Sequence, residues 1–343
     1  MSLLLMSAGI TLCSDSEKKA GSLKTWLQKH TGRNESIPKL NNLKELDLIN
    51  KRLVALPESI GQLKNLTHLY LSLNKLEALP HSIGKLKRLT VLSIRANTLQ
   101  SLPPQLFKLH DLRELDLSLN KLRRLPPATG ELKSLEKLNI SGNRLLSLPR
   151  TLGKSESLKS LTLDSSNMNS LTVAKGSFQN LSHLHIVSSK SILQSPGLTP
   201  DVKEQLRIEN ESGIKFIPPG QSPVRDDSEP DPDRVFDVAG RMDKLSHLSV
   251  VSYRMSGLPG SVVRVKNINK LYLWSNGLET LNPEITRLKE LRELSLWNNR
   301  LRTLPLEIRN LKRLRLLDLR RNKIPIEEQE KIKRLLPQCE IIF

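Results

Sequence analysis

Residues 43–65 read LKELDLINKRLVALPESIGQLKN, and this 23-residue pattern returns along most of the chain. Its first part spaces leucines so that they alternate along a short strand, and its second part holds a Leu-Pro pair and an Ile-Gly pair. Alternating apolar residues place one face of a strand in a core and the other in solvent. A unit this short cannot bury its apolar face alone, so the copies must stack on one another. The copies begin at Leu43, Leu66, Leu89, Leu112, Leu135, Leu158, Leu181, Leu245, Ile268, Leu291 and Leu314.

This pattern resembles the leucine-rich repeat, in the 23-residue Leu-Pro-x-x-Ile-Gly-x-Leu class found in leptospiral and other bacterial repeat proteins. The resemblance covers about residues 37–343. It implies an α/β fold, a leucine-rich repeat solenoid curved like a horseshoe with parallel strands on its concave face. We therefore expect about twelve repeats, one of them degenerate.

The regular repeat spacing breaks between Leu181 and Leu245, an interval longer than two repeats. Two repeats and a short surplus would fill this interval, so we expect a degenerate repeat over about residues 203–244. Pro, Asp and Ser dominate residues 219–237, which predicts an acidic insertion loop. A short helix over 200–209 is an alternative for part of the same interval.

The two ends of the solenoid, which spans residues 43–322, need capping segments, because terminal repeats otherwise expose their core. We expect an N-terminal cap over residues 17–42 that contains a helix near 22–30. A C-terminal cap is expected over residues 323–343, with an amphipathic helix.

The first residues, 1–16, form an apolar N-terminal segment that includes Cys13. An apolar run that ends in Cys before polar residues resembles the end of a lipoprotein export signal, with Cys13 as the lipidated residue. The segment departs from that pattern because no Lys or Arg precedes the run and Leu12 replaces a small residue. We expect an exported or envelope-associated protein that touches membrane only through this anchor, with a cytoplasmic protein as the alternative.

The composition is strongly basic, with 54 Lys and Arg against 35 Asp and Glu and a net charge of +19. Such a charge invites binding to nucleic acid or to anionic membranes. The repeat register distributes it unevenly: the 44 solvent-facing concave positions of the eleven regular units carry a net −2, and the other 299 residues carry +21. Repeated Lys on outer turns is typical of a solvated surface, so nucleic acid is not the expected partner.

Four of the six Trp and Tyr residues fall on the concave positions, namely Tyr70, Tyr272, Trp274 and Trp297. Trp274 and Trp297 share a column on neighbouring strands, roughly 5 Å apart at the backbone. Rigid aromatic side chains inside a polar rim are typical of binding hot spots, which makes this group the candidate partner-binding site. An alternative is that the rings only stack on one another. The expected polar rim is Lys270, Glu293, Asn298, Asp318, Arg320 and Arg321.

Signals for catalysis or cofactor binding are weak throughout the chain. His183, His185 and His247 are the clustered histidines. With a degenerate repeat between them, His183 and His247 would lie two strand spacings apart, about 10 Å, which is too far for one zinc ion. Two cysteines exclude a disulfide scaffold, and neither has a nearby His suited to nucleophilic catalysis. We expect no enzyme activity, no bound metal and no cofactor.

The sequence thus predicts a non-enzymatic, monomeric interaction module that binds a protein partner on its concave face, a host protein being one candidate. The alternative is electrostatic adhesion to nucleic acid, glycosaminoglycan or anionic membrane through the basic convex and flanking faces. The two hypotheses differ in salt dependence, since adhesion weakens steeply with salt and does not require the tryptophans.

Overall fold

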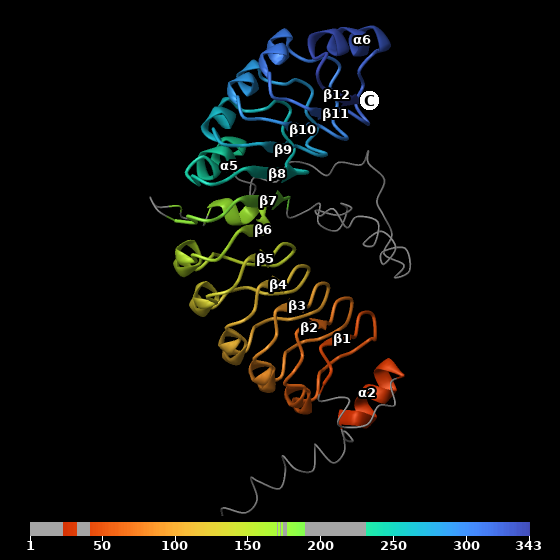
Figure 1. The fold of residues 1–343 in the computed structure, drawn as a ribbon, viewed down its shortest axis with the longest axis vertical. Helices are drawn as coiled ribbons and strands as arrows, with labels where there is room; N and C mark the ends of the chain where they lie inside the picture. The colour runs from red at the N-terminus through yellow and green to blue at the C-terminus, as the bar shows by residue number, and fades with distance from the viewer. Residues whose placement is uncertain (1–22, 33–41, 170, 172, 174–176, 189–230) are drawn as a thin grey trace, which may run out of the picture. The chain divides into compact units, whose positions relative to one another are not determined.

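The computed structural model describes residues 23–32, 42–169, 171, 173, 177–188 and 231–343 (Figure 1). The chain divides into two compact units, residues 1–122 and 123–343. The segment with Cys13, the alternative helix at 200–209 and most of the expected insertion loop lie outside the described residues.

Each strand of the first unit pairs in parallel with the next strand along the chain, one repeat later. Leu46 lies opposite Leu69, and Leu69 lies opposite Leu92, so equivalent leucines stack into one core. These leucines are fully buried. The strands are β1 (Glu45–Asp47), β2 (His68–Tyr70), β3 (Val91–Ser93) and β4 (Glu114–Asp116).

The second unit shows the same parallel pairing over eight strands. The described residues therefore hold twelve parallel strands, which confirms the predicted leucine-rich repeat solenoid of about twelve repeats. The strands are β5 (Lys137–Asn139), β6 (Ser160–Asp164), β7 (His183–Val187), β8 (His247–Val251), β9 (Lys270–Tyr272), β10 (Glu293–Ser295), β11 (Leu316–Asp318) and β12 (Glu340–Ile342).

The strands on either side of the long interval are direct neighbours in the sheet. β7 pairs with β8 over five residues, with Leu184 opposite Leu248, so no described strand lies between them. The prediction of a degenerate repeat over 203–244 was therefore wrong, and the twelfth strand is β12 near the C-terminus. The interval from Leu181 to Leu245 is one repeat that carries a long insertion.

Part of the expected acidic loop at 219–237 is helical instead. α5 (Pro232–Ala239) begins after Asp231, whose side chain caps the helix by accepting a hydrogen bond from the Asp233 N–H. Asp and Pro at these positions are typical of a helix start, and Val235 and Phe236 bury the apolar face of the helix. α5 packs against the helical turn of the next repeat, as the short helices of other repeats do.

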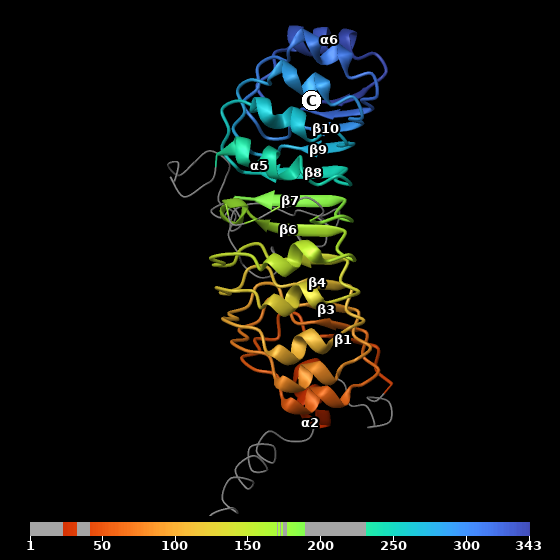
Figure 2. The same cartoon turned by 90° about the vertical axis from the view of Figure 1, so that its left-hand side faces the viewer.

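Short 3₁₀ helices follow the Leu-Pro pair of most repeats and stack on the side opposite the strands within each unit (Figure 2). In some of these helices a glycine lets successive turns approach closely: a Cβ added to Gly84 would lie 2.5 Å from the Gln105 carbonyl oxygen. The helices are η1 (Glu58–Gln62), η2 (His81–Lys85), η3 (Pro104–Lys108), η4 (Pro127–Glu131), η5 (Arg150–Lys154), η6 (Ser165–Asn169), η7 (Gly260–Arg264), η8 (Pro283–Arg287) and η9 (Leu306–Asn310).

Buried asparagines connect the turns of successive repeats. The Asn299 side-chain N–H₂ donates to the carbonyl oxygens of Leu273 and Leu296, both at 2.8 Å. Its side-chain oxygen accepts from the N–H groups of Asn276 and Leu278, both at 3.0 Å. Satisfying the backbone of a buried turn in this way explains why Asn recurs at this position.

A helix lies near each end of the described chain. α2 (Leu23–Thr31) buries Leu23 and Leu27 in the first unit. In the second unit, α6 (Ile326–Leu335) buries Ile332 and precedes β12. None of the described helices combines the length and apolar character that a membrane span would require.

Candidate functional site

Nine residues on the strand face of β9, β10 and β11, and just beyond the ends of these strands, form the candidate site. We call them the β9–β11 cluster. All of them lie in the second unit. Because equivalent positions of neighbouring repeats lie opposite one another in the parallel sheet, the 23-residue period brings these side chains together. The cluster consists of Lys270, Tyr272, Trp274, Glu293, Ser295, Trp297, Asp318, Arg320 and Arg321.

Lys270, Glu293 and Tyr272 form the first part of the cluster. The Lys270 Nζ lies 2.7 Å from Glu293 Oε1, and the Tyr272 hydroxyl donates to Glu293 Oε2 at 2.8 Å. Burial opposes ionisation of Glu293, but these two hydrogen bonds outweigh it and lower the pKa of the carboxyl. Burial and the adjacent carboxylate raise the pKa of Tyr272 far above its usual value, so the phenol keeps its proton.

Trp274 connects this group to Asp318. Its ring stacks on Tyr272 with centroids 5.2 Å apart, and its indole N–H donates to Ser295 Oγ at 2.7 Å. Ser295 Oγ in turn donates to Asp318 Oδ2 at 3.1 Å. The Arg320 guanidinium binds the same carboxylate through two N–H groups, at 2.9 and 2.8 Å. The indole is therefore held in one orientation by both stacking and hydrogen bonding.

Asp318 differs from the sequence-based expectation of a solvated rim residue, because it is only 7% exposed. Burial raises its pKa, but the hydrogen bonds from Arg320 and Ser295 outweigh burial and hold the pKa below its usual value. The side chain consequently orients Arg320 and Ser295 rather than presenting a carboxylate to solvent.

Trp297 contacts an arginine side chain. Among the described residues no ring contact joins it to Trp274; instead, the Arg321 guanidinium carbon lies 5.0 Å from the centre of its ring. This is a cation–π contact. The other expected rim residue, Asn298, donates its side-chain N–H₂ to Ser275 Oγ at 2.9 Å. Arg321 and Asn298 both have a positive φ, as do equivalent residues of other repeats.

Tyr70, the remaining aromatic candidate, lies on β2 in the first unit and is not a member of the cluster. Burial raises its pKa, and the negative charges of Glu45, Glu114 and Asp47 raise it further. Its ring lies 6.3 Å from that of His68. This half-buried tyrosine thus lies on an acidic strand face.

The histidines are closer together than the sequence indicated. The expected separation of two strand spacings between His183 and His247 was wrong, because β7 pairs with β8 and the two rings stack with centroids 4.1 Å apart. Burial lowers the pKa of His247 to about 4, with His183 and Lys270 contributing. Burial likewise lowers the pKa of His185 to about 4. Among the described residues no group of three potential ligands is placed to hold a metal ion.

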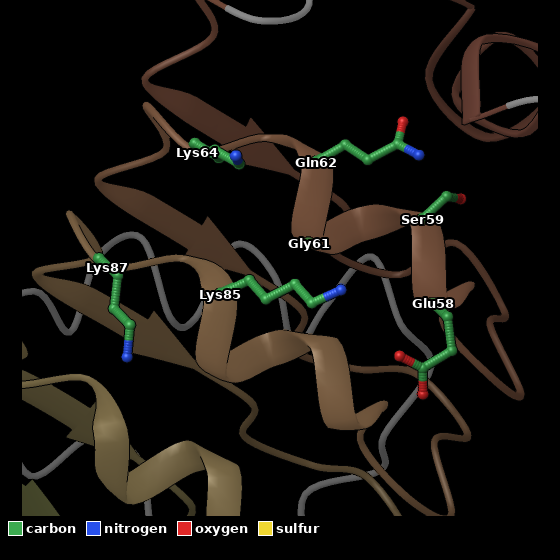
Figure 3. A pocket seen from close by; sticks show the side chains of 7 residues that line it. All are labelled: Glu58, Ser59, Gly61, Gln62, Lys64, Lys85 and Lys87. Carbon is green, nitrogen blue, oxygen red and sulfur yellow. The ribbon is translucent and has the colours of Figure 1, made fainter.

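A shallow pocket of about 590 Å³ lies away from the strands in the first unit (Figure 3). Glu58, Ser59 and Gln62 contribute from η1, and Lys85 from η2. The Glu58 carboxylate accepts hydrogen bonds from the N–H groups of His81 and Ser82 at the start of η2. The pocket therefore lies beside a contact that links two repeats, and its lining contains no aromatic side chain.

The stacked parallel strands and repeated turns are those of a leucine-rich repeat solenoid. The family model described as leucine rich repeat matches residues 41–99, 87–145 and 266–324. A leucine-rich repeat protein of Leptospira interrogans is 33% identical, over 90% of this chain and 74% of that one, with a TM-score of 0.53. The chain thus belongs to the leucine-rich repeat proteins, of the leptospiral type predicted from the sequence.

A second solved structure supports the fold alone. The internalin InlF of Listeria monocytogenes has a TM-score of 0.54 and 16% identity, over 95% of this chain and 87% of that chain. No curated protein sequence matches the chain significantly. The leucine-rich repeat is a family of protein-interaction modules, typically without enzyme activity.

The cluster contains one residue, Ser295, that the sequence pattern does not single out. Ser295 lies between Trp274 and Asp318 and accepts from one while donating to the other. The one indication in the sequence is its position in the repeat, which places it opposite Tyr272 on the next strand. A serine at a solvent-facing position carries no distinguishing chemistry until its neighbours are known.

Proposed function

We propose that the protein is a non-enzymatic interaction module whose β9–β11 cluster binds a protein partner on the exposed strand face. The observation that supports it is the fixed arrangement of the aromatic rings. Tyr272 and Trp274 are half-buried and stacked, and hydrogen bonds to Glu293 and Ser295 hold both polar ends. Aromatic side chains that are ordered before binding lose little entropy on contact, which favours them as anchors.

The experiment compares capture of proteins from host and bacterial extracts by the wild type and by Trp274→Ala/Trp297→Ala. We expect the double variant to lose the proteins that the wild type retains, because anchor residues of this kind contribute about 2 kcal/mol or more each. Leu146→Ala/Leu306→Ala is the matched control, since both leucines are large and exposed yet lie outside the cluster. Equal capture by the wild type and the tryptophan variant, with unchanged melting curves, would contradict the proposal.

The alternative of polyanion adhesion is less well supported by the flanking charges. Lys266, Lys289 and Lys312 occupy the same position on the outer turns of three successive repeats. However, ion pairs neutralise neighbouring cations, including Arg287 with Glu284 and Arg313 with Glu290. Repeating the capture at two salt concentrations separates the two hypotheses. Binding by polyanion adhesion would be lost at high salt, whereas binding through the aromatic rings would persist.

A further inference from the structure

In the β9–β11 cluster both carboxylates are paired with cluster cations, and one arginine is left over to contact a partner. Every oxygen of both carboxylates already accepts a hydrogen bond: Glu293 accepts from Lys270 and Tyr272, and Asp318 accepts from Arg320 and Ser295. Lys270 and Arg320 are the cations of these two pairs. Arg321 is the additional charge, and it gives the cluster a net positive balance.

Among the residues that the structure describes, no hydrogen bond or ion pair engages the Arg321 side chain, although Trp297 orders it. A guanidinium that lies over an indole uses its face for that contact and keeps its N–H donors at its edge. Five N–H donors in a planar fork match the two oxygens of a carboxylate. Arg321 therefore presents carboxylate-binding chemistry beside the Trp297 ring, about two strand spacings, or roughly 10 Å, from the stacked rings of Tyr272 and Trp274.

The backbone further fixes the direction of this side chain. Arg321 has a φ of 56°, and the same column has a φ of 55° at Ser275 and Asn298. Hydrogen bonds between repeats hold this turn, for example from the Asn298 N–H to the Arg320 carbonyl oxygen at 2.9 Å. The position is thus set by the repeat rather than by a mobile loop, which reduces the entropy lost on binding.

We infer that the cluster recognises a peptide segment in which an Asp or Glu carboxylate lies within a few residues of a flat apolar side chain. Arg321 binds the carboxylate, while Tyr272 and Trp274 contact the apolar side chain. A basic segment does not fit, because neither cluster carboxylate is available to it and Arg321 would repel it. The inference rests on the proposed function and deepens it by naming the chemistry of the partner.

A random peptide library displayed on phage tests this inference against the intact protein. We expect the wild type to enrich peptides with Asp or Glu within a few residues of an aromatic or proline residue. Arg321→Gln should lose the acidic preference while keeping the apolar one, and Arg321→Lys should retain it only partly, because Lys lacks the planar fork. Arg302→Gln, which removes an exposed charge of the same unit, is the control and should leave the preference intact.

A double-mutant cycle then measures the contact itself. An enriched peptide with an amidated C-terminus, and its Asp→Asn form, are titrated against the wild type and Arg321→Gln by fluorescence polarisation. We expect the Asp→Asn change to weaken binding about tenfold or more in the wild type and hardly at all in the variant. Equal loss in both proteins, or a preference for basic peptides, would overturn the inference.

The two proposals fail in different ways. If Trp274→Ala/Trp297→Ala loses the peptide but Arg321→Gln binds it as the wild type does, the site stands and its carboxylate preference does not. If the tryptophan variant also binds normally, the cluster is not the binding site. Circular dichroism melting curves of all variants establish that each comparison is made on folded protein.

Discussion

Asp164 shows how strongly the local strand pairing can change the burial and the pKa of one side chain. The sequence register places it among the solvent-facing concave positions, yet its side chain is 1% exposed. β6 and β7 pair over five residues instead of three, so the paired region extends to Asp164 and Val187. The carboxylate accepts from the N–H groups of Gly142 and Asn143. Burial nevertheless dominates and raises its pKa to about 6.

We predict that Asp164→Asn changes the pH dependence of stability. Since the pKa rises from 3.8 to about 6 on folding, the folded state binds this proton more tightly and loses stability as pH rises through that window. The loss approaches about 3 kcal/mol above pH 6. The asparagine cannot ionise. In thermal melts from pH 4.5 to 8, the melting temperature of the variant should therefore rise relative to that of the wild type as pH increases.

An offset between the two proteins that stays the same at every pH would reflect only the lost acceptor oxygen, and it would contradict this prediction. Comparing the two proteins at each pH also removes the opposite effect of the histidines. The lowered pKa values of His185 and His247 make the wild type less stable as pH falls from 6.5 towards 4, and Asp164→Asn leaves both histidines in place.

At the scale of the element, the 23-residue period predicts the strands well because each repeat contains its own strand, turn and core residues. The prediction of side-chain partners is weaker. The shared column of Trp274 and Trp297 predicted the spacing of their backbones and left ring stacking as an alternative; in the structure Trp274 stacks on Tyr272, and Trp297 contacts Arg321. Column position fixes the backbone spacing, whereas side-chain rotamers depend on hydrogen bonds such as that to Ser295, which the period does not contain.

Removing one link between elements should be costly. Asn299→Ala would leave two N–H groups and two carbonyl oxygens in adjacent turns without their side-chain partner. We expect it to lower the free energy of unfolding by about 2–4 kcal/mol in urea titrations. Asn310→Ala, at an exposed position of η9, should change it by less than about 0.5 kcal/mol. Similar values for both variants would show that the buried asparagine is not the link between turns.

At the scale of the whole molecule, repeat arithmetic finds the eleven regular repeats, but it shows neither where additional chain is inserted nor that β12 supplies the twelfth strand. The interval from Leu181 to Leu245 fits two repeats with a surplus as readily as one repeat with an insertion. Strand pairing distinguishes them, and it depends on contacts between residues far apart in sequence. His183 opposite His247 is such a contact. The same error displaced the histidines by one strand spacing and concealed their stacking.

The pairing of β7 with β8 predicts that residues 189–230 can be replaced by a linker of about ten residues without loss of the fold. The Ser188 N–H bonds directly to the Val251 carbonyl oxygen, and α5 retains its cap at Asp231. The shortened protein should keep its far-ultraviolet circular dichroism per repeat and its melting temperature. Leu248→Asp in the full chain is the control. It should lower the melting temperature sharply because Leu248 is fully buried, and this loss would establish that the measurement detects damage in this region. A large loss of stability in the shortened protein would instead mean that the replaced residues form part of the packed solenoid.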